Sequence, residues 1–241
     1  MFNPSYKAFG NKAILIEWPP QISEEILYDI LCFKNKIKIH YNNIIDITTA
    51  YNSLTIYLKK EIQNFENEKI KLNKIYNFEF EELAIENFIW HIPVCYDKIV
   101  APDLITFLKQ KKMPLKQLIR YHTKNLYTVY FLGFLPGFPY LGGLPEILHF
   151  PRKGNPHLKV EKGSVGIGGQ QTGVYTQDSP GGWHIIGKTP ISFFDANLTK
   201  PCFLKAGDKV KFESISYKQF LSFSTQVAQG IFKIEKEILN A

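Results

Sequence analysis

In the first 95 residues, the spacing of hydrophobic positions alternates between the two-residue period of strands and the wider period of helices. Short β-branched runs predict strands, and longer segments with apolar residues on one face predict helices. The predicted elements are a strand at 13–18, a helix from Ser23, strands at 44–51 and 54–58, a helix at 61–72 and a strand at 88–95. This β-α-β-β-α-β order predicts a small ferredoxin-like α/β domain, with helices on one face of an antiparallel sheet.

Prolines mark two further predicted helices. One starts near Pro102, with Asp103 in its first turn, and the other starts near Pro114; proline at a first helical position gives up no hydrogen bond.

The pattern changes at residue 133, because residues 133–190 hold thirteen of the sixteen glycines and seven of the fourteen prolines. Short strands between such breakers predict a β-barrel or sandwich. We therefore expect an α+β protein with domains at 1–92 and 93–241.

Composition narrows the class of protein. The 241 residues suit two domains, and 45% hydrophobic with 21% charged residues excludes disordered and fibrous classes. Three scattered cysteines and six histidines lack the spacing of a disulfide framework or a metal site, which favours a cytoplasmic protein without a metal. The N-terminal segment lacks the pattern of a signal peptide, and no apolar stretch is long enough to span a bilayer, so no membrane partner is expected.

The basic charge balance raises the question of a nucleic-acid partner. Lysine and arginine number 29 against 22 acidic residues, but only Arg120 and Arg152 are arginines, and many lysines lie beside acids. Mixed charges of this kind are typical of a solvated surface. We expect no nucleic-acid partner.

Two glycine-containing motifs suggest phosphate or cofactor binding without meeting its requirements. Residues 182–189 match the phosphate-loop pattern letter for letter, but the Trp-His-Ile-Ile interior predicts a strand and Pro190 prevents a helix from following. The segment 163–173 (GSVGIGGQQTG) has Gln171 where a dinucleotide-binding motif needs glycine. Its glycines permit either two closely crossing backbones or a substrate held by Gln171 and Thr172.

Several other residues allow both a structural and a chemical interpretation. Arg152 offers a planar fork for a carboxylate or phosphate, or a surface salt bridge. His122 is a candidate for proton transfer, or a satisfied structural histidine. In the loop FLPGFPYLGGL, Phe138 and Tyr140 form either the apolar wall of a ligand site or a core plug, and the turn that begins at Ser179 precedes an anchoring Trp183. No motif of serine hydrolases occurs in the sequence.

Taken together, the motifs in 131–195 resemble one family. They are FLGFLPGFPYLGGL, Pro-Arg, GSVGIGGQQTGVY and SPGGWHIIGKTP, with weaker agreement over about residues 90–212. The segment is similar to the 5-oxoprolinase B subunit, the PxpB/KipI family, which is related to the carboxyltransferase subdomain of urea amidolyase and of allophanate hydrolase subunit 1. The sequence departs from the family pattern at four positions: Ala101, His157, Glu161 and Lys188.

The resemblance implies a cyclophilin-like β-barrel at 93–241 and a place in a multi-subunit hydrolase. With the A and C subunits of 5-oxoprolinase (PxpA- and PxpC-like), the complex would open 5-oxo-L-proline to L-glutamate while hydrolysing ATP. ATP is expected to bind to the complex, and the chain is expected to be inactive alone. The implied catalytic residues are Arg152, Gln171 and His122, and the implied substrate-binding residues are Phe138, Tyr140, Thr172, Ser179, Gly181, Gly182 and Trp183.

Two alternatives stay open at this point. KipI-like members of the family bind a sensor histidine kinase and inhibit it, in which case the LPGFPYLGG loop would be a docking surface. The chain could instead be a carboxyltransferase component that acts on a urea-like substrate.

Overall fold

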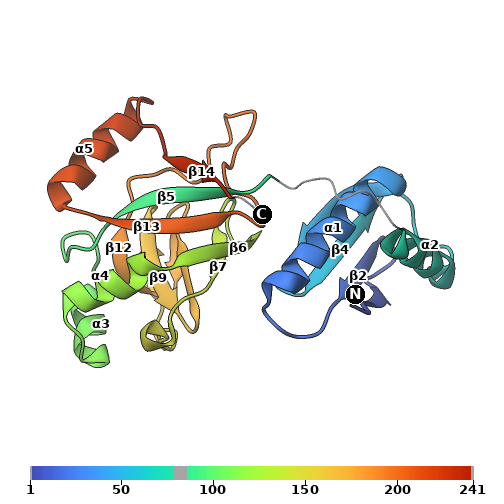
Figure 1. Ribbon diagram of the computed structural model, residues 1–241, viewed down its shortest axis with the longest axis horizontal. Coiled ribbons are helices and arrows are strands. Elements are labelled where there is room, and N and C mark those ends of the chain that lie inside the picture. Colours follow the sequence, from blue (N-terminus) through green and yellow to red (C-terminus); the bar gives the residue numbers. More distant parts are fainter. Residues whose placement is uncertain (1, 79–85, 240–241) are drawn as a thin grey trace. The chain divides into compact units, whose positions relative to one another are not determined.

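The computed structural model describes residues 2–78 and 86–239, which fall into two compact units, 1–85 and 86–241 (Figure 1). Within these described ranges, no helix is both long and apolar enough to cross a membrane. Each unit has its own hydrophobic core.

The first unit is a four-stranded antiparallel sheet with two helices. Its elements are β1 (Ser5–Ala8), β2 (Ala13–Glu17), α1 (Glu24–His40), β3 (Ile44–Thr49), β4 (Ser53–Leu58) and α2 (Phe65–Asn77). The sheet order is β1-β2-β4-β3, and Figure 1 shows α1 lying along the sheet. The edge strand beside β2 is β1, which precedes it in the chain, instead of a strand after α2. The ferredoxin-like order of elements is therefore not confirmed.

The two helices of this unit begin at side-chain caps. The Ser23 hydroxyl accepts a hydrogen bond from the Ile26 amide at 3.2 Å, as the sequence predicts for α1. The Asn64 side chain accepts from the Asn67 amide at 3.1 Å, so α2 begins several residues later than predicted. Buried residues of α1, such as Ile30, pack on the sheet in one core cluster.

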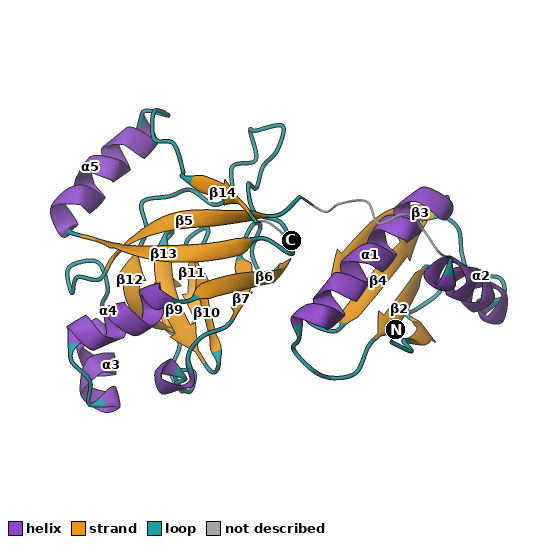
Figure 2. Cartoon of the chain, viewed as in Figure 1, coloured by secondary structure: helices purple, strands orange, loops and turns teal. Residues whose placement is uncertain are grey.

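The second unit is a closed β-barrel with helices outside it (Figure 2). Its elements are β5 (Phe88–Cys95), α3 (Leu104–Lys111), α4 (Leu115–Lys124), β6 (Leu126–Leu132), β7 (Pro139–Gly142), the 3-10 helix η1 (Glu146–Leu148), β8 (His157–Val160), β9 (Ser164–Gly168), β10 (Gln171–Val174), β11 (Ser179–Gly181), β12 (His184–Lys188), β13 (Lys209–Ile215), α5 (Tyr217–Ala228) and β14 (Lys236–Ile238). Seven strands follow one another as β12-β9-β10-β7-β6-β13-β5, and β5 pairs with β12 to close the ring. The predicted barrel is confirmed.

The unit boundary differs from the expected one at 92/93, which falls inside β5. Residues 89–95 of this strand pair in parallel with residues 209–215 of β13. These long-range hydrogen bonds attach the whole of β5 to the barrel. The strand predicted at 88–95 is therefore present, but it belongs to the second unit.

The barrel interior is packed mainly with apolar side chains. Ile92, Val129, Ile167 and Phe212 are all fully buried within it and belong to one cluster. Ligand pockets are therefore found around the barrel strands and their connections.

Two sequence motifs of this unit, the apparent phosphate loop and the start of α3, can be compared with the structures predicted for them. Residues 184–188 form strand β12, paired with β9, so the apparent phosphate loop is a strand as predicted. Asp103 is the N-cap residue of α3 instead of a first-turn acid, and its side chain binds groups outside the helix instead of capping it.

We expect β14 to detach from β5 more readily as the pH rises. The ring of His91 on β5 lies 2.7 Å from a carboxylate oxygen of Glu213 on β13 and 2.9 Å from one of Glu237 on β14. Burial would lower the pKa of His91, but the two carboxylates raise it by more. A raised folded-state pKa gives stability that is complete below the unfolded pKa and is lost as the pH rises through the folded one.

Hydrogen exchange tests this expectation. The Leu239 amide donates to the Asn87 carbonyl beside β14, at 2.8 Å. After correction for intrinsic exchange, its protection should fall as the pH rises above about 6.5, the ordinary histidine pKa, and through the raised pKa of His91. The variant His91→Gln should not show this pH dependence. Equal pH dependence in both proteins would contradict the expectation.

Candidate functional site

A surface cavity of about 350 Å³ lies in the second unit, where the loop before β7, the loop before β8 and the connection from β11 to β12 meet. We call it the aromatic pocket. The residues that line it are Phe134, Phe138, Tyr140, Arg152, Lys153, Pro156, Tyr175, Pro180, Gly181, Gly182 and Trp183.

The wall of the aromatic pocket is a cluster of edge-to-face rings centred on Phe138. Ring centroids lie 5.6 Å from Phe138 for Trp183, 5.6 Å for Tyr175 and 5.3 Å for Tyr140. Phe138, Tyr175 and Trp183 are buried, which fixes their positions, whereas Phe134 is 63% exposed. Rings packed in this way supply a rigid apolar surface with little conformational freedom.

Glycines let the barrel backbone approach this ring cluster. A Cβ atom on Gly168 of β9 would lie 2.7 Å from Cγ of Trp183 and closer still to Cδ1 and Nε1. A Cβ atom on Gly173 of β10 would lie 3.1 Å from Trp183 and 3.2 Å from Phe138. The glycine-rich segment therefore permits a close approach, but at Gly168 the backbone meets the side chain of Trp183 instead of a second backbone.

Two cationic side chains lie on the polar side of the pocket. The guanidinium carbon of Arg152 lies 5.9 Å from the centre of the Trp183 ring, within cation–π distance. Lys153 is the next residue along the loop and also lines the pocket. Burial raises the pKa of Tyr175, and the charge of Arg152 offsets part of that shift. The pocket therefore combines an apolar wall with positive charge.

A buried carboxylate holds Lys153 in place. Asp103, which is 7% exposed, lies 2.5 Å from Nζ of Lys153 and 2.9 Å from Nε2 of His157, and it accepts the Ile185 amide at 2.9 Å. Burial would raise the pKa of Asp103, but hydrogen bonds from Lys153, the Ile185 amide and His157 outweigh it, so this pKa lies below its usual range. We call Lys153, Asp103 and His157 the Asp103 bridge.

Sequence reasoning missed this bridge. Asp103 follows Pro102 at the start of a helix, and a carboxylate at such a position is normally interpreted as a cap. Its partners are 50 and 54 residues away in the chain.

Six of the predicted site residues lie together in the aromatic pocket: Phe138, Tyr140, Arg152, Gly181, Gly182 and Trp183. Gln171 and Ser179 begin strands β10 and β11 and are not among the residues that line it. The Ser179 hydroxyl donates to the Pro180 carbonyl at 3.2 Å.

His122 and Thr172 lie in the barrel core and not in the pocket. The Thr172 hydroxyl donates to the Gly166 carbonyl at 3.0 Å, so it must accept from Nε2 of His122 at 2.9 Å. Nδ1 of His122 is then the acceptor for the Tyr96 hydroxyl at 2.6 Å. Burial lowers the pKa of His122 to about 3, so the ring is neutral, as in a satisfied structural histidine.

Among residues 2–78 and 86–239, no group of three or more His, Cys, Asp or Glu side chains is placed to hold a metal ion. The chemistry that the described pocket offers is the binding of a ligand with an apolar body and an anionic group.

Comparison with known proteins agrees with the motif resemblance. Residues 4–204 match the family "Carboxyltransferase domain, subdomain C and D". The 5-oxoprolinase B subunit of Escherichia coli O157:H7 is 37% identical over 84% of this chain and 92% of its own length. The protein of the same name from Bacillus subtilis (strain 168) is 35% identical over 90% of this chain and 95% of its own length.

The fold recurs inside a larger protein. The crystal structure of the K. lactis urea amidolyase superposes with a TM-score of 0.79 and 18% identity, covering 98% of this chain and 16% of that one. Identity this low supports likeness of fold alone. The family match and the two curated relatives, over nearly their full lengths, establish that the chain belongs to the 5-oxoprolinase B subunit family of carboxyltransferase-like proteins.

Proposed function

We propose that the chain is the B subunit of an ATP-dependent 5-oxoprolinase, which opens 5-oxo-L-proline to L-glutamate together with partner A and C subunits. The names of its relatives support the assignment. The observation that carries it is the aromatic pocket, where Arg152 lies over the Trp183 ring. We expect the complex to work in the cytoplasm.

The substrate is complementary to the pocket in two features, an apolar ring face and a carboxylate. 5-Oxoproline is a five-membered lactam with methylene groups on one side and a carboxylate beside the ring nitrogen. The ring would pack on Phe138 and Trp183, and the carboxylate would accept hydrogen bonds from Arg152. A guanidinium fork matches a carboxylate better than an ammonium does.

Opening the lactam requires activation, because an amide carbon is a poor electrophile. In the proposed reaction the lactam oxygen takes the terminal phosphoryl group of ATP, one water adds to the activated carbon, and the carbon–nitrogen bond breaks so that nitrogen leaves as the amine. A second water then hydrolyses the resulting acyl phosphate and releases phosphate. The products are glutamate, ADP and phosphate. The chain's own pocket residues would bind and orient the lactam and exclude water from its apolar face.

Partner polypeptides would complete the site. The exposed Phe134 ring at the edge of the pocket is suited to contact with another polypeptide. We expect ATP to be bound by the complex and this chain to be inactive alone.

Reconstitution tests the proposal. The chain, mixed with the A and C subunits, should show ATP hydrolysis that depends on 5-oxoproline. Arg152→Ala should lower kcat/KM for 5-oxoproline by about tenfold to a hundredfold, the usual effect of losing a charge-assisted hydrogen bond. Arg120→Ala is the matched control, because Arg120 is the other arginine of the sequence and lies beside Tyr121, away from the pocket residues.

Gln171→Ala extends the test to a residue outside the pocket lining. If Gln171 bonds the substrate amide, the double variant of Arg152→Ala and Gln171→Ala should have a lower kcat/KM for 5-oxoproline than Arg152→Ala alone. Full activity of the double variant would overturn the site assignment, and absence of 5-oxoproline-dependent activity in the wild-type complex would overturn the function.

A second candidate function follows from the family match itself. A carboxyltransferase domain of this kind would support transfer of a carboxyl group to a urea-like substrate. The same reconstituted complex can be supplied with a carboxylated biotin carrier and urea. Consumption of urea without any effect of 5-oxoproline would favour this alternative.

A further inference from the structure

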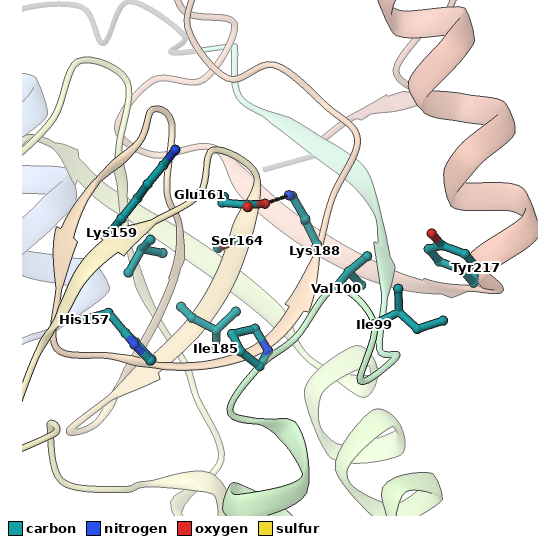
Figure 3. Close-up of a pocket in the computed structure, with 11 residues that line it drawn as sticks. Ile99, Val100, His157, Lys159, Glu161, Ser164, Ile185, Lys188 and Tyr217 are labelled. Atoms are coloured by element: carbon teal, nitrogen blue, oxygen red, sulfur yellow. Dashed lines mark hydrogen bonds and ion pairs between the residues drawn. The ribbon is translucent and has the colours of Figure 1, made fainter.

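A second cavity, of about 340 Å³, lies where β8, β9 and β12 meet the segment after β5 and the start of α5 (Figure 3). We call it the paired-charge pocket. The residues that line it are Ile99, Val100, Pro102, His157, Lys159, Val160, Glu161, Ser164, Ile185, Lys188 and Tyr217. They differ throughout from the residues that line the aromatic pocket.

An ion pair dominates the polar side of this pocket. Nζ of Lys188 contacts a carboxylate oxygen of Glu161, as Figure 3 shows. The hydrogen bond from Lys188 and its charge hold the pKa of Glu161 below the usual range, so this carboxylate is ionised at neutral pH. The side chain of Lys188 is 20% exposed and that of Glu161 is 66% exposed, so a ligand can reach both.

Paired charges of this kind discriminate between classes of ligand. A ligand with adjacent carboxylate and ammonium groups can bond to both residues at once, its carboxylate to Lys188 and its ammonium to Glu161. A ligand with a single charge can bond to only one residue of the pair and lies beside the like charge of the other, which weakens its binding. The pair therefore favours a zwitterion.

The pocket offers a further cation and an apolar wall. Lys159 pairs with Asp178 at 2.9 Å, and both side chains are at least half exposed, so the Lys159 ammonium can exchange this partner for a ligand carboxylate at little cost. Val100, Val160 and Ile185 contribute an apolar surface for a short methylene chain. This arrangement suits two carboxylates and one ammonium on a short aliphatic body.

We propose that the paired-charge pocket binds an acidic α-amino acid. Its α-ammonium bonds to Glu161, its α-carboxylate to Lys188 and its side-chain carboxylate to Lys159. The proposal goes beyond the function proposed above, because binding at this pocket requires no turnover. If both hold, L-glutamate is the product of the reaction as well as the ligand of a separate site on the same chain.

Isothermal titration calorimetry of the full chain tests the ligand class. L-Glutamate should bind, whereas glutarate, which lacks the ammonium, and L-glutamine, which lacks the second carboxylate, should each bind about tenfold more weakly or worse. 5-Oxoproline has no ammonium and should not compete. Absence of L-glutamate binding, or equal affinity for glutarate, would overturn the proposal.

Variants locate the site. Lys188→Met and Glu161→Gln should each weaken L-glutamate binding by about tenfold or more, and thermal unfolding would verify that each variant is folded. Lys7→Met is the matched control, because Lys7 forms a similar ion pair with Glu17 in the first unit. Arg152→Ala should leave L-glutamate affinity unchanged. Affinity lost in Arg152→Ala but kept in Lys188→Met would place the ligand in the aromatic pocket and overturn the inference.

Discussion

Replacing Asp103 with alanine is expected to lower the free energy of unfolding by about 3 kcal/mol, the usual effect of removing one member of a buried ion pair. The variant leaves the Lys153 ammonium, whose Nζ lies 2.7 Å from Nε2 of His157, without the carboxylate that balances its charge. It also leaves the amide of Ile185, a buried residue, without its acceptor. Chemical denaturation of both proteins measures the difference.

Asp178→Ala is the matched control for this prediction. The Asp178 carboxylate also bonds a lysine ammonium and a backbone amide, but it lies at the surface, where water replaces both partners. Its loss should therefore have a much smaller effect than the loss of Asp103. Equal effects of the two substitutions would show that burial of Asp103 does not strengthen the bridge.

The loss of stability caused by Asp103→Ala should become smaller as the pH falls. Because the folded-state pKa of Asp103 is lowered, its contribution to stability is present above the unfolded pKa of an aspartate and is lost as the pH falls through the folded one. The difference between wild type and Asp103→Ala should therefore narrow under acidic conditions. A difference that widens towards low pH would contradict this assignment.

Gly168→Ala is expected to destabilise the second unit by about 3 kcal/mol and to disrupt the aromatic pocket. The added methyl group would lie within 2.7 Å of three atoms of the Trp183 ring. This ring packs edge to face on Phe138 in a buried cluster, so it cannot move without displacing its neighbours, and overpacking of a core costs about 1–3 kcal/mol or more. Thermal unfolding, with near-ultraviolet circular dichroism of the tryptophan, measures both effects.

Gly154→Ala separates this clash from a general effect of replacing glycine. A Cβ atom on Gly154 would meet no atom within 4 Å, and the residue has no positive φ. This control should change stability by less than about 0.5 kcal/mol, as surface substitutions usually do. A Gly168→Ala protein as stable as the Gly154→Ala protein would contradict the packing argument.

Much of the fold can be predicted from the sequence where local signals are strong. The β-branched run at 13–18, the Ser23 cap and the glycine- and proline-rich texture after residue 133 each predict an element or class that the structure contains. The phosphate-loop pattern at 182–189 could be rejected because its interior residues favour a strand.

The two errors in the predicted fold, which concern β1 and β5, have physical causes. Strand β1 (Ser5–Ala8) has one half-buried residue and three exposed ones, so it lacks the hydrophobic alternation that marks a strand. Strand β5 has a clear local signal, but its partners, β13 above all, lie far later in the chain. Local patterns show that such a strand exists and cannot show which sheet it joins.

Some residues of the candidate site can likewise be predicted from the sequence, whereas others depend on tertiary contacts. The family resemblance implies one site for Phe138, Arg152 and Trp183, and all three line the aromatic pocket. The sequence makes His122 a candidate for proton transfer, but its environment depends on Tyr96 and Thr172, which only the closed barrel brings together. The Asp103 bridge likewise depends on tertiary contacts.

The closure of the barrel has a mechanical consequence. Strands β12 and β5 are joined at one residue pair, Lys188 with Cys95, whereas β5 and β13 share seven. This seam is one of two places in the ring where neighbouring strands are joined at a single residue pair, the other being Thr172 with Leu141 between β10 and β7. Lys188 and Ile185 stand on one side of it, and Val100 follows β5 on the other, all three bordering the same cavity. A small molecule bound there would contact residues on both sides of this sparsely paired join and so help to hold the barrel closed.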